Sequence, residues 1–508
     1  MTAAAGTEVP GRPRFAAAWL GALPFLGVIV FVAGLGLGVS GPDVPILALA
    51  ATTGVFCLLP PILDQARPGP RRHLLLTFFS LFWFMYYVLP VWTRYFMGDP
   101  TNEKTSFLMG LVFMDPADII RGQLAALVSL LIVYTAYLLP FGTTIGRALP
   151  QPRQDWSHEG TLLVAWGIIP VGWAIYLGSQ LGIVPGRAGS GALGVVAMGI
   201  FYGIALLAFA YIRYRSRTAF LAMTVLIPLT MAFNFFTGSK TKTLLALAMV
   251  AFAYVVVNRR IRIRYVAAAV LGIALLYPTA AFYRDVVLVE NTKTAVDILR
   301  NPVRAIDDVS AFIATHSVKE YLVNGFKATG NRTSALNMTT LIIRDTPDRV
   351  PFQGGWTIGY AFVAYIPRII WPGKPAIGIG QWVTDNYVTT GPGIIRSSTG
   401  PSWIGELYLN FGYWGIIVGM FIVGTYFRVL HEWVFHPKQT IPMLLLGVVC
   451  LFSICPTLGG TILGCISFLP FFGPAILLGH WVARSVGPPV PVAGSGPTGL
   501  PANAGVRT

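Results

Sequence analysis

The sequence predicts an all-α polytopic membrane protein with about twelve transmembrane helices. Of its 508 residues, 55% are hydrophobic and 11% are charged, whereas an ordinary soluble domain has roughly 25% charged residues. A soluble fold cannot bury so much apolar surface. The net charge of +16 would suggest a nucleic-acid partner in a soluble protein. Here the basic residues sort by loop, so nucleic-acid-binding, secreted and soluble-enzyme classes are excluded.

The apolar residues form runs of about 20 residues, long enough to cross a hydrocarbon core of roughly 30 Å. These runs lie at 17–39, 44–63, 73–93, 122–145, 160–183, 192–212, 218–237, 243–257, 265–283, 403–427, 440–458 and 462–481. The first run is too long for the core of a signal peptide and lacks a convincing cleavage site, so we expect it to be retained.

Basic residues in the connections predict the orientation of the spans. Lys and Arg number 18 in one set of alternating connections and 6 in the other short connections. Because basic loops stay on the cytoplasmic side, both termini are expected in the cytoplasm. The predicted parts are a cytoplasmic N-terminus (1–16), spans one to nine (17–284), a large extracytoplasmic loop (285–402), spans ten to twelve (403–485) and a disordered cytoplasmic tail (486–508).

The large loop carries the remaining 12 basic residues, counting Arg284 at its border. Structureless loops beyond about 12–15 residues are uncommon, and this loop is predicted to be partly helical. Helical spacing links its apolar residues Ile298, Leu299, Val303, Ile306, Val309 and Ile313, and Pro302 divides them into two helices. The apolar stretch 356–371 is short for a span, so it is predicted to be an interfacial or re-entrant element.

Cations gather at the outer membrane border, where unpaired ionisable groups are costly and therefore candidates for function. They are Lys240, Lys242, Arg284, Arg368, Lys374 and Arg396. Such a set suits an anionic headgroup, because a guanidinium can pair with two phosphate oxygens at once. The alternative for each residue is a side chain that snorkels to the interface or contacts lipid headgroups.

The segment TGPSWIGELYLNFGYWG, which begins at Thr399, contains the most informative carboxylate. Ser402 can cap the incoming helix, and Glu406 lies in its first turn, where the helix dipole favours an anion. That structural role is one interpretation. The other makes Glu406 a desolvated general base beside Trp403 and Tyr408, which would activate or orient an acceptor hydroxyl.

Metal and redox chemistry have no sequence signal. The four cysteines, Cys57, Cys450, Cys455 and Cys465, lie in apolar runs and are predicted to be small core residues. His431 and His436 are five residues apart, a poor spacing for shared metal ligation, and are predicted to be surface histidines. D-x-D, H-E-x-x-H and P-loop motifs are absent, so neither a metal nor a cofactor is expected.

Several of these motifs resemble those of the Wzy-type O-antigen polymerases, the oligosaccharide repeat-unit polymerases. The resemblance rests on Gly-Ser-Lys at 238–240, on Ile-Pro-Arg followed by Trp-Pro-Gly-Lys-Pro, and on Pro-Ser-Trp-Ile-Gly-Glu-Leu-Tyr-Leu-Asn-Phe-Gly within 365–420. It implies a GT-C-type fold related to the O-antigen ligases, in the bacterial cell membrane. The implied activity transfers a growing glycan from its undecaprenyl diphosphate to a sugar of another lipid-linked unit on the outer face.

The hypothesis assigns each candidate residue a part in that chemistry. Arg284, Arg368 and Arg396 would bind the diphosphate, and Lys240 and Lys374 would add charge, because positioned cations can stabilise a leaving group without a metal. Glu406 would activate the acceptor, with Arg368 and Arg396 as its catalytic partners. The predicted glycan platform consists of Trp356, Tyr360, Trp371, Trp382, Tyr387, Trp403 and Tyr408.

Two other functions remain open. An O-antigen ligase would break the same bond but transfer the glycan to a different acceptor, so the sequence does not separate it from a polymerase. A transporter or flippase of lipid-linked oligosaccharide would need charged residues along an internal pathway, and the centres of the predicted spans contain almost none. The expected partners are the lipid bilayer, the lipid-linked oligosaccharide and a chain-length regulator.

Overall fold

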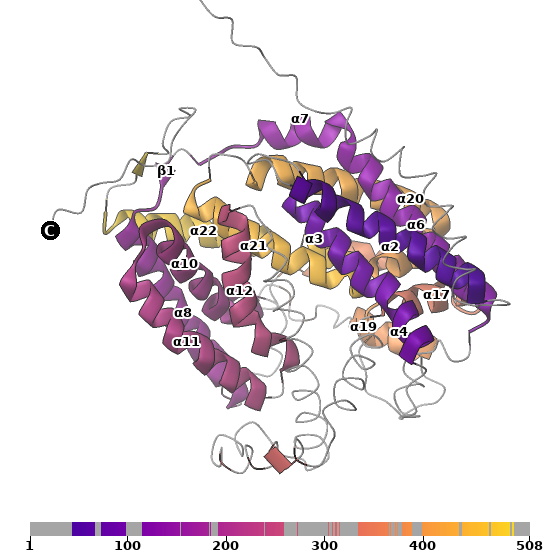
Figure 1. The fold of residues 1–508 in the computed structure, drawn as a ribbon, viewed down its shortest axis with the longest axis horizontal. Helices are drawn as coiled ribbons and strands as arrows, with labels where there is room; N and C mark the ends of the chain where they lie inside the picture. The colour runs from indigo at the N-terminus through magenta and orange to yellow at the C-terminus, as the bar shows by residue number, and fades with distance from the viewer. Residues whose placement is uncertain are drawn as a thin grey trace, which may run out of the picture.

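The computed structural model describes residues 43–66, 73–97, 114–152, 154–181, 192–237, 239–258, 334–364, 378–388, 399–435, 439–466, 469–487 and 490–491, with a few single residues between them. Their regular structure is helical except for one pair of two-residue strands (Figure 1). In chain order the elements are α2 (Asp43–Ala66), α3 (Leu74–Trp83), η1 (Phe84–Val88), α4 (Leu89–Met97), α6 (Pro116–Leu138), α7 (Pro140–Ala148), β1 (Gln154–Asp155), α8 (His158–Gln180), α9 (Ala192–Ala197), α10 (Gly199–Tyr214), α11 (Arg217–Phe236), α12 (Lys240–Asn258), α17 (Ala335–Asp345), α18 (Trp356–Ala364), α19 (Ile379–Val383), η5 (Thr384–Val388), α20 (Trp403–Val434), α21 (Ile441–Ile454), η6 (Cys455–Gly459), η7 (Ile462–Cys465), α22 (Leu469–Arg484) and β2 (Val490–Pro491).

Among the described residues, seven helices are long and apolar enough to cross a membrane. They are Val44–Asp64, Leu74–Thr93, Pro116–Leu138, His158–Gln180, Arg217–Phe236, Trp403–Val434 and Ile441–Gly459. The prediction of an all-α membrane protein is therefore confirmed. The predicted spans at 17–39 and, but for one residue, 265–283 lie outside the described residues, so the count of twelve stays a prediction.

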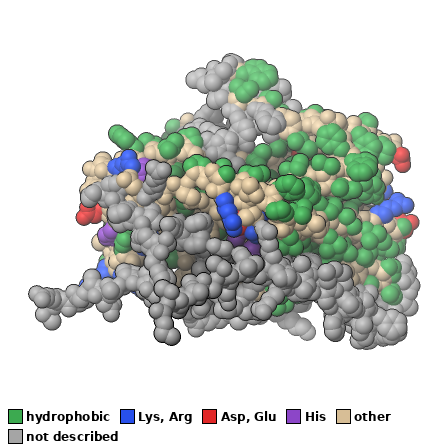
Figure 2. Space-filling view, turned by 90° about the horizontal axis from the view of Figure 1, so that it is seen from above, with side chains coloured by type: hydrophobic (Ala, Val, Ile, Leu, Met, Phe, Trp, Pro, Cys, Tyr) green, Lys and Arg blue, Asp and Glu red, His purple; other side chains and the backbone are tan. Residues whose placement is uncertain are grey.

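The outer surface of the bundle is apolar, as a lipid-facing surface must be. Figure 2 shows hydrophobic side chains covering much of one face. Large exposed side chains include Trp414, Leu477 and Trp481, each more than 70% exposed. A soluble protein of this kind would aggregate, whereas a bilayer covers such side chains with hydrocarbon.

The helices form two packed groups (Figure 1). One contains α8, α10, α11 and α12, and the other contains α2, α3, α6, α17 and α20. α21 contacts helices of both groups and is largely buried between them. We call the two ends of the second group the α7 end and the α17 end, after the short helices that lie there.

The predicted span 122–145 is two helices. α6 ends at Leu138, Leu139 is extended with ψ = 151°, and Pro140 begins α7. A proline disfavours helical geometry in the residue before it and is well tolerated at the first helical position. α7 then packs on α20, where Gly142 and Gly146 lie so close to Arg428 and Val429 that a Cβ would collide with them.

α20 also consists of two helices, although its hydropathy predicts one continuous span. Its backbone leaves helical geometry at Gly412, where φ = 62° and ψ = −150°. The longer segment after the break packs against the shorter one, so that a Cβ at Gly415 would lie 2.2 Å from the Leu407 carbonyl oxygen. The break therefore folds the first nine residues of α20 against its long helix.

The predicted loop 285–402 is described mainly by α17, α18, α19 and η5. α17 is buried along most of its length against α6 and α20. Within the predicted interfacial stretch 356–371, α18 has nine residues, too few to cross a bilayer. The helical pattern that begins at Ile298 falls outside the described residues, apart from single positions.

Two side-chain predictions have different outcomes. All four cysteines are free and buried, in agreement with a role as small core residues. The prediction that His431 is a surface residue is wrong, because α20 turns it into the bundle, where only 6% of it is exposed and its ring centroid lies 4.7 Å from that of His73. His436 lies outside the described residues.

The contact between α6 and α20 predicts the effect of adding one methyl group. A Cβ at Gly424 would lie 2.4 Å from the Val133 carbonyl oxygen, and this backbone atom cannot rotate away. Gly424→Ala should lower the free energy of unfolding by about 1–3 kcal/mol, the usual range for overpacking. Unfolding of the detergent-solubilised protein by SDS titration measures this change.

Gly167→Ala in α8 is the matched control, because no atom lies within 4 Å of the added Cβ. It should leave the unfolding midpoint unchanged or slightly raised, since Ala favours a helix over Gly. Equal midpoints for the two variants would contradict the close approach of α6 and α20.

Candidate functional site

The start of α20 is fixed by a buried hydroxyl pair. Ser402 has φ = 62°, and its Oγ accepts a hydrogen bond from the Gly405 N–H at 3.0 Å, as the predicted cap requires. The same Oγ lies 2.7 Å from Oγ1 of Thr339 in α17. Because both residues are completely buried, this pair fixes the first turn of α20 against α17.

Glu406 lies one turn later and is fully buried, with 0% of the residue exposed. Its Oε2 accepts a hydrogen bond from the Ile462 N–H at 2.6 Å, which connects α20 to η7. Its Oε1 has no hydrogen-bond partner within normal distance among the described residues. None of the ion pairs among those residues includes Glu406. A buried carboxyl group without a cation is costly, so its retention is more typical of function than of packing.

Asn410 organises the surroundings of Glu406. Its Nδ2 donates to the Glu406 carbonyl oxygen at 2.7 Å and to the Thr357 hydroxyl at 2.6 Å, and its Oδ1 accepts from the Gly355 N–H at 2.9 Å. The Thr357 hydroxyl is fully buried and accepts this bond, so its own proton stays available for the nearby Glu406 side chain. Asn410 thereby connects α20 to the start of α18 and positions Thr357 beside the carboxyl group.

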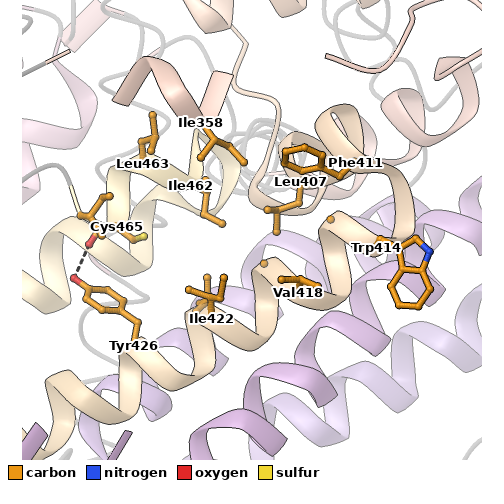
Figure 3. A pocket seen from close by; sticks show the side chains of 14 residues that line it. Ile358, Leu407, Phe411, Trp414, Val418, Ile422, Tyr426, Ile462, Leu463 and Cys465 are labelled. Carbon is orange, nitrogen blue, oxygen red and sulfur yellow. Dashed lines mark hydrogen bonds between the residues drawn. The ribbon is translucent and has the colours of Figure 1, made fainter. Parts of the chain in front are cut away.

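An apolar groove of about 640 Å³ is lined by both segments of α20 and by η7 (Figure 3). Its lining residues are Ile358, Leu407, Phe411, Trp414, Gly415, Val418, Gly419, Ile422, Val423, Tyr426, Ile462, Leu463, Cys465 and Ile466. The Tyr426 hydroxyl donates to the Cys465 carbonyl oxygen at 3.0 Å and so does not present a free donor to the groove. Ile462 both lines the groove and donates its N–H to Glu406, so the buried carboxyl group lies next to a residue of the groove wall.

An arginine and aromatic cluster lies near this site, at the α17 end. Asp345 is paired with Arg344 at 2.7 Å and with Arg349 at 2.6 Å, and Arg349 lies over the ring of Tyr387. Burial raises the pKa of Tyr387 to about 12, and its hydroxyl lies 2.6 Å from Oγ1 of Thr346. Arg349 is about half exposed, so it can still meet an anion at the surface.

The sequence analysis did not predict Arg344 and Arg349, because the cations that it selected were those at the predicted membrane border. The signal that could have found them is the segment Arg344-Asp-Thr-Pro-Asp-Arg349, in which two cations flank two carboxylates. Thr357 and Asn410 were missed too. Their roles depend on contacts between distant segments, for which the sequence has no spacing signal.

The predicted diphosphate site cannot be located among the described residues. Arg284, Arg368, Lys374 and Arg396 lie outside them, as does the side chain of Lys240. Their roles therefore stay predictions.

The predicted glycan platform divides into three groups. Trp356 and Trp382 are half-buried and meet edge to face at 5.8 Å, and Tyr360 is also half-buried. Trp371 is exposed. The other three residues, Tyr387, Trp403 and Tyr408, are buried. Trp403 packs against Phe79 and Phe427 at 0% exposure, so it is a core residue here and does not form part of a glycan-facing surface.

A family comparison places part of this site in a known sequence family. The family described as Domain of unknown function (DUF8712) matches residues 190–453, just over half of the chain. The chain belongs to the DUF8712 family. The DUF8712 segment contains Thr357, Glu406 and Asn410 but ends before Ile462. No curated protein and no solved structure matches the chain.

The Asn410 network predicts the consequence of its removal. Asn410→Ala would leave the Gly355 N–H and the Thr357 hydroxyl without a buried partner, at a cost of about 1–3 kcal/mol for each. The free energy of unfolding should fall by that order, as measured by SDS titration. Asn258→Ala is the control, because this exposed amide makes a single local bond, to the Tyr254 carbonyl oxygen. A loss for Asn410→Ala no larger than the control's would contradict the proposed network.

Proposed function

We propose that this protein is a membrane glycosyltransferase that polymerises undecaprenyl-diphosphate-linked oligosaccharide units on the outer face of the bacterial cell membrane. The observation that carries the proposal is the position of Glu406. Among the described residues its buried carboxyl group has no ion-pair partner, and it accepts a hydrogen bond from Ile462, which lines a hydrocarbon-lined groove. An enzyme that acts on the headgroup of a lipid needs this combination, because the reacting atoms are polar and the carrier is apolar. The resemblance of residues 365–420 to the repeat-unit polymerases supports the same class.

The chemistry requires one proton acceptor and stabilisation of one leaving group. Oε1 of Glu406 would accept the proton of the acceptor hydroxyl, whose oxygen then forms a bond to the anomeric carbon of the donor sugar. The bond from that carbon to the lipid diphosphate breaks, and the diphosphate leaves with the electron pair. Arg284, Arg368 and Arg396 would stabilise its charge, so the transfer would not need a metal.

Ile462 and Asn410 would hold the base in position. The Ile462 N–H fixes Oε2, so Oε1, which has no hydrogen-bond partner among the described residues, is the atom that would accept the proton. The arginine and aromatic cluster, with the adjoining Trp356 and Trp382, would contact the glycan, since the two indole rings are only half-buried and Arg349 retains exposed donors.

Replacement of the base is the first functional prediction. Glu406→Gln keeps the shape of the side chain but cannot accept the proton, so glycan transfer should fall about 10²–10⁴-fold. The assay uses the purified protein in liposomes with defined lipid-linked repeat units and resolves the product as a ladder of chain lengths. Arg368→Ala and Arg396→Ala should shorten or abolish the ladder at normal membrane abundance.

Glu159→Gln is the matched control, because Glu159 also lies in the first turn of a helix but is exposed. It should leave the ladder intact. Normal ladders from Arg368→Ala and Arg396→Ala would remove the diphosphate assignment. In the same assay, glycan on a different acceptor would identify a ligase, and unmodified lipid in the opposite leaflet would identify a flippase.

The groove generates a second functional prediction. Ile422 lines the groove but is 61% exposed, so Ile422→Trp can fill the space without disturbing the core. If the indole displaces two methylene groups of the lipid chain from the groove, at about 0.8 kcal/mol each, the lipid-linked substrate should bind about tenfold more weakly. The KM should therefore rise more than kcat falls. Val225→Trp on α11 is the control, since Val225 is 65% exposed and lies outside the groove. An unchanged KM for Ile422→Trp would exclude the groove as the site of the lipid.

A further inference from the structure

One buried face of α3 and η1 carries a row of polar side chains. His73 precedes the helix, and Thr77, Ser80 and Tyr87 follow at intervals of four, three and seven residues, which place them on one side of a helix. Thr77, Ser80 and Tyr87 are each no more than 2% exposed. The inside of a membrane protein is a costly place for hydroxyl groups unless each has a partner.

Hydroxyl groups of neighbouring helices contact this row. Ser80 Oγ lies 2.6 Å from the Tyr134 hydroxyl, and His73 Nδ1 lies 2.7 Å from the Tyr137 hydroxyl, both in α6. At the other end, the Tyr87 hydroxyl faces the Thr339–Ser402 pair, which fixes the first turn of α20. The polar side chains therefore extend from the α7 end to the turn that carries Glu406.

Unpaired atoms lie along the same face. Thr77 Oγ1, Trp83 Nε1 and the Tyr87 hydroxyl are buried and have no hydrogen-bond partner among the described residues. Buried polar groups in native proteins are almost always paired with protein or with ordered water. One turn of helix rises 5.4 Å, about the span of two hydrogen bonds through a single water molecule. Ordered water can thus satisfy these atoms and join groups one turn apart.

Titratable groups lie at both ends of the row. Glu406 is at the α17 end, and the His73–His431 pair is at the α7 end. Charged and titratable groups surround this pair. Asp64 accepts a hydrogen bond from the backbone N–H of His73, and the Tyr137 hydroxyl contacts the His73 ring. Arg428 lies over the Tyr137 ring and pairs with Glu432, which also pairs with Arg147.

We propose that these side chains and bound water form a proton path between Glu406 and the His73–His431 pair. Hydroxyl groups and water both donate and accept hydrogen bonds, so each can take up one proton and release another. A proton would leave the Glu406 carboxyl group, move by such exchanges to an imidazole nitrogen, and pass from it to solvent. The Trp83 indole only donates, so it orients water and does not carry the proton.

The path does not depend on glycan transfer, and its test does not require it. If Glu406 is the base of the proposed reaction, the path also explains how a fully buried carboxyl group loses the proton that it gains in each cycle. The proton would move through the interior of the helix bundle rather than through the apolar groove.

Proton flux through the full-length protein tests the proposal. Liposomes contain the protein and a pH-sensitive dye, and a potassium diffusion potential drives protons inward. Wild-type protein should let the liposome interior acidify faster than in protein-free liposomes. The double variant Thr77→Val and Ser80→Ala should lower the flux about tenfold or more, since each lost hydroxyl removes a hydrogen bond of about 1 kcal/mol from the path.

Thr230→Val is the matched control. Thr230 is also fully buried, and its hydroxyl has no partner within the described part of the chain, but it lies on α11, in the other group of helices. It should leave the flux at the wild-type level. Equal flux in wild-type and protein-free liposomes, or in wild-type and the double variant, would overturn the proposal.

A second measurement covers the case in which the double variant does not fold. Hydroxyl radicals generated by X-rays from bound water oxidise the side chains next to that water, and mass spectrometry locates the products. Trp83 and Tyr134 of the wild-type protein should be oxidised although they are buried, whereas Phe209, also buried, should not. Protection of Trp83 and Tyr134 to the same degree as Phe209 would show a dry interface and would exclude the path.

Discussion

At Gly412 the backbone of α20 takes φ = 62° and ψ = −150°, a conformation that glycine adopts without the strain that a Cβ would add. The site depends on this break. It folds residues 403–411 against the long helix, and the two segments then form much of the groove wall, with Leu407 packed on Gly415 and Gly419. A continuous helix would carry Glu406 away from the groove, because helical residues six or more positions apart are separated by about 9 Å or more along the axis.

Ion pairing distinguishes Glu406 from Asp155, Glu432 and Asp345, three other carboxylates of the described residues. Asp155 pairs with Arg213 and accepts hydrogen bonds from the N–H groups of Trp156 and Ile441, so it connects β1 to α10 and α21. Glu432 pairs with Arg428 and Arg147. Such ion pairs join helices at the ends of the bundle, where solvent reduces the cost of desolvation.

Glu406 instead has one backbone N–H and the Asn410–Thr357 network around it. This arrangement positions the carboxyl group without neutralising it. The helix dipole also favours a glutamate in the first turn of a helix at an exposed position, such as that of Glu159 in α8. The burial of Glu406 therefore calls for a reason other than helix capping, and a proton-transfer role supplies one.

The sequence by itself determined the class of protein, the capping role of Ser402 and the choice of Glu406 as the carboxylate of interest. These features follow from composition and from local spacing, since hydrophobic runs of about 20 residues and a cap three residues before a helical N–H involve neighbours in the chain. Only the tertiary structure decided that α20 is broken, that His431 and Trp403 are buried, and that Thr357, Asn410 and Ile462 surround Glu406. These contacts join segments tens of residues apart, and their partners are chosen by packing geometry, for which the linear sequence has no periodic signal.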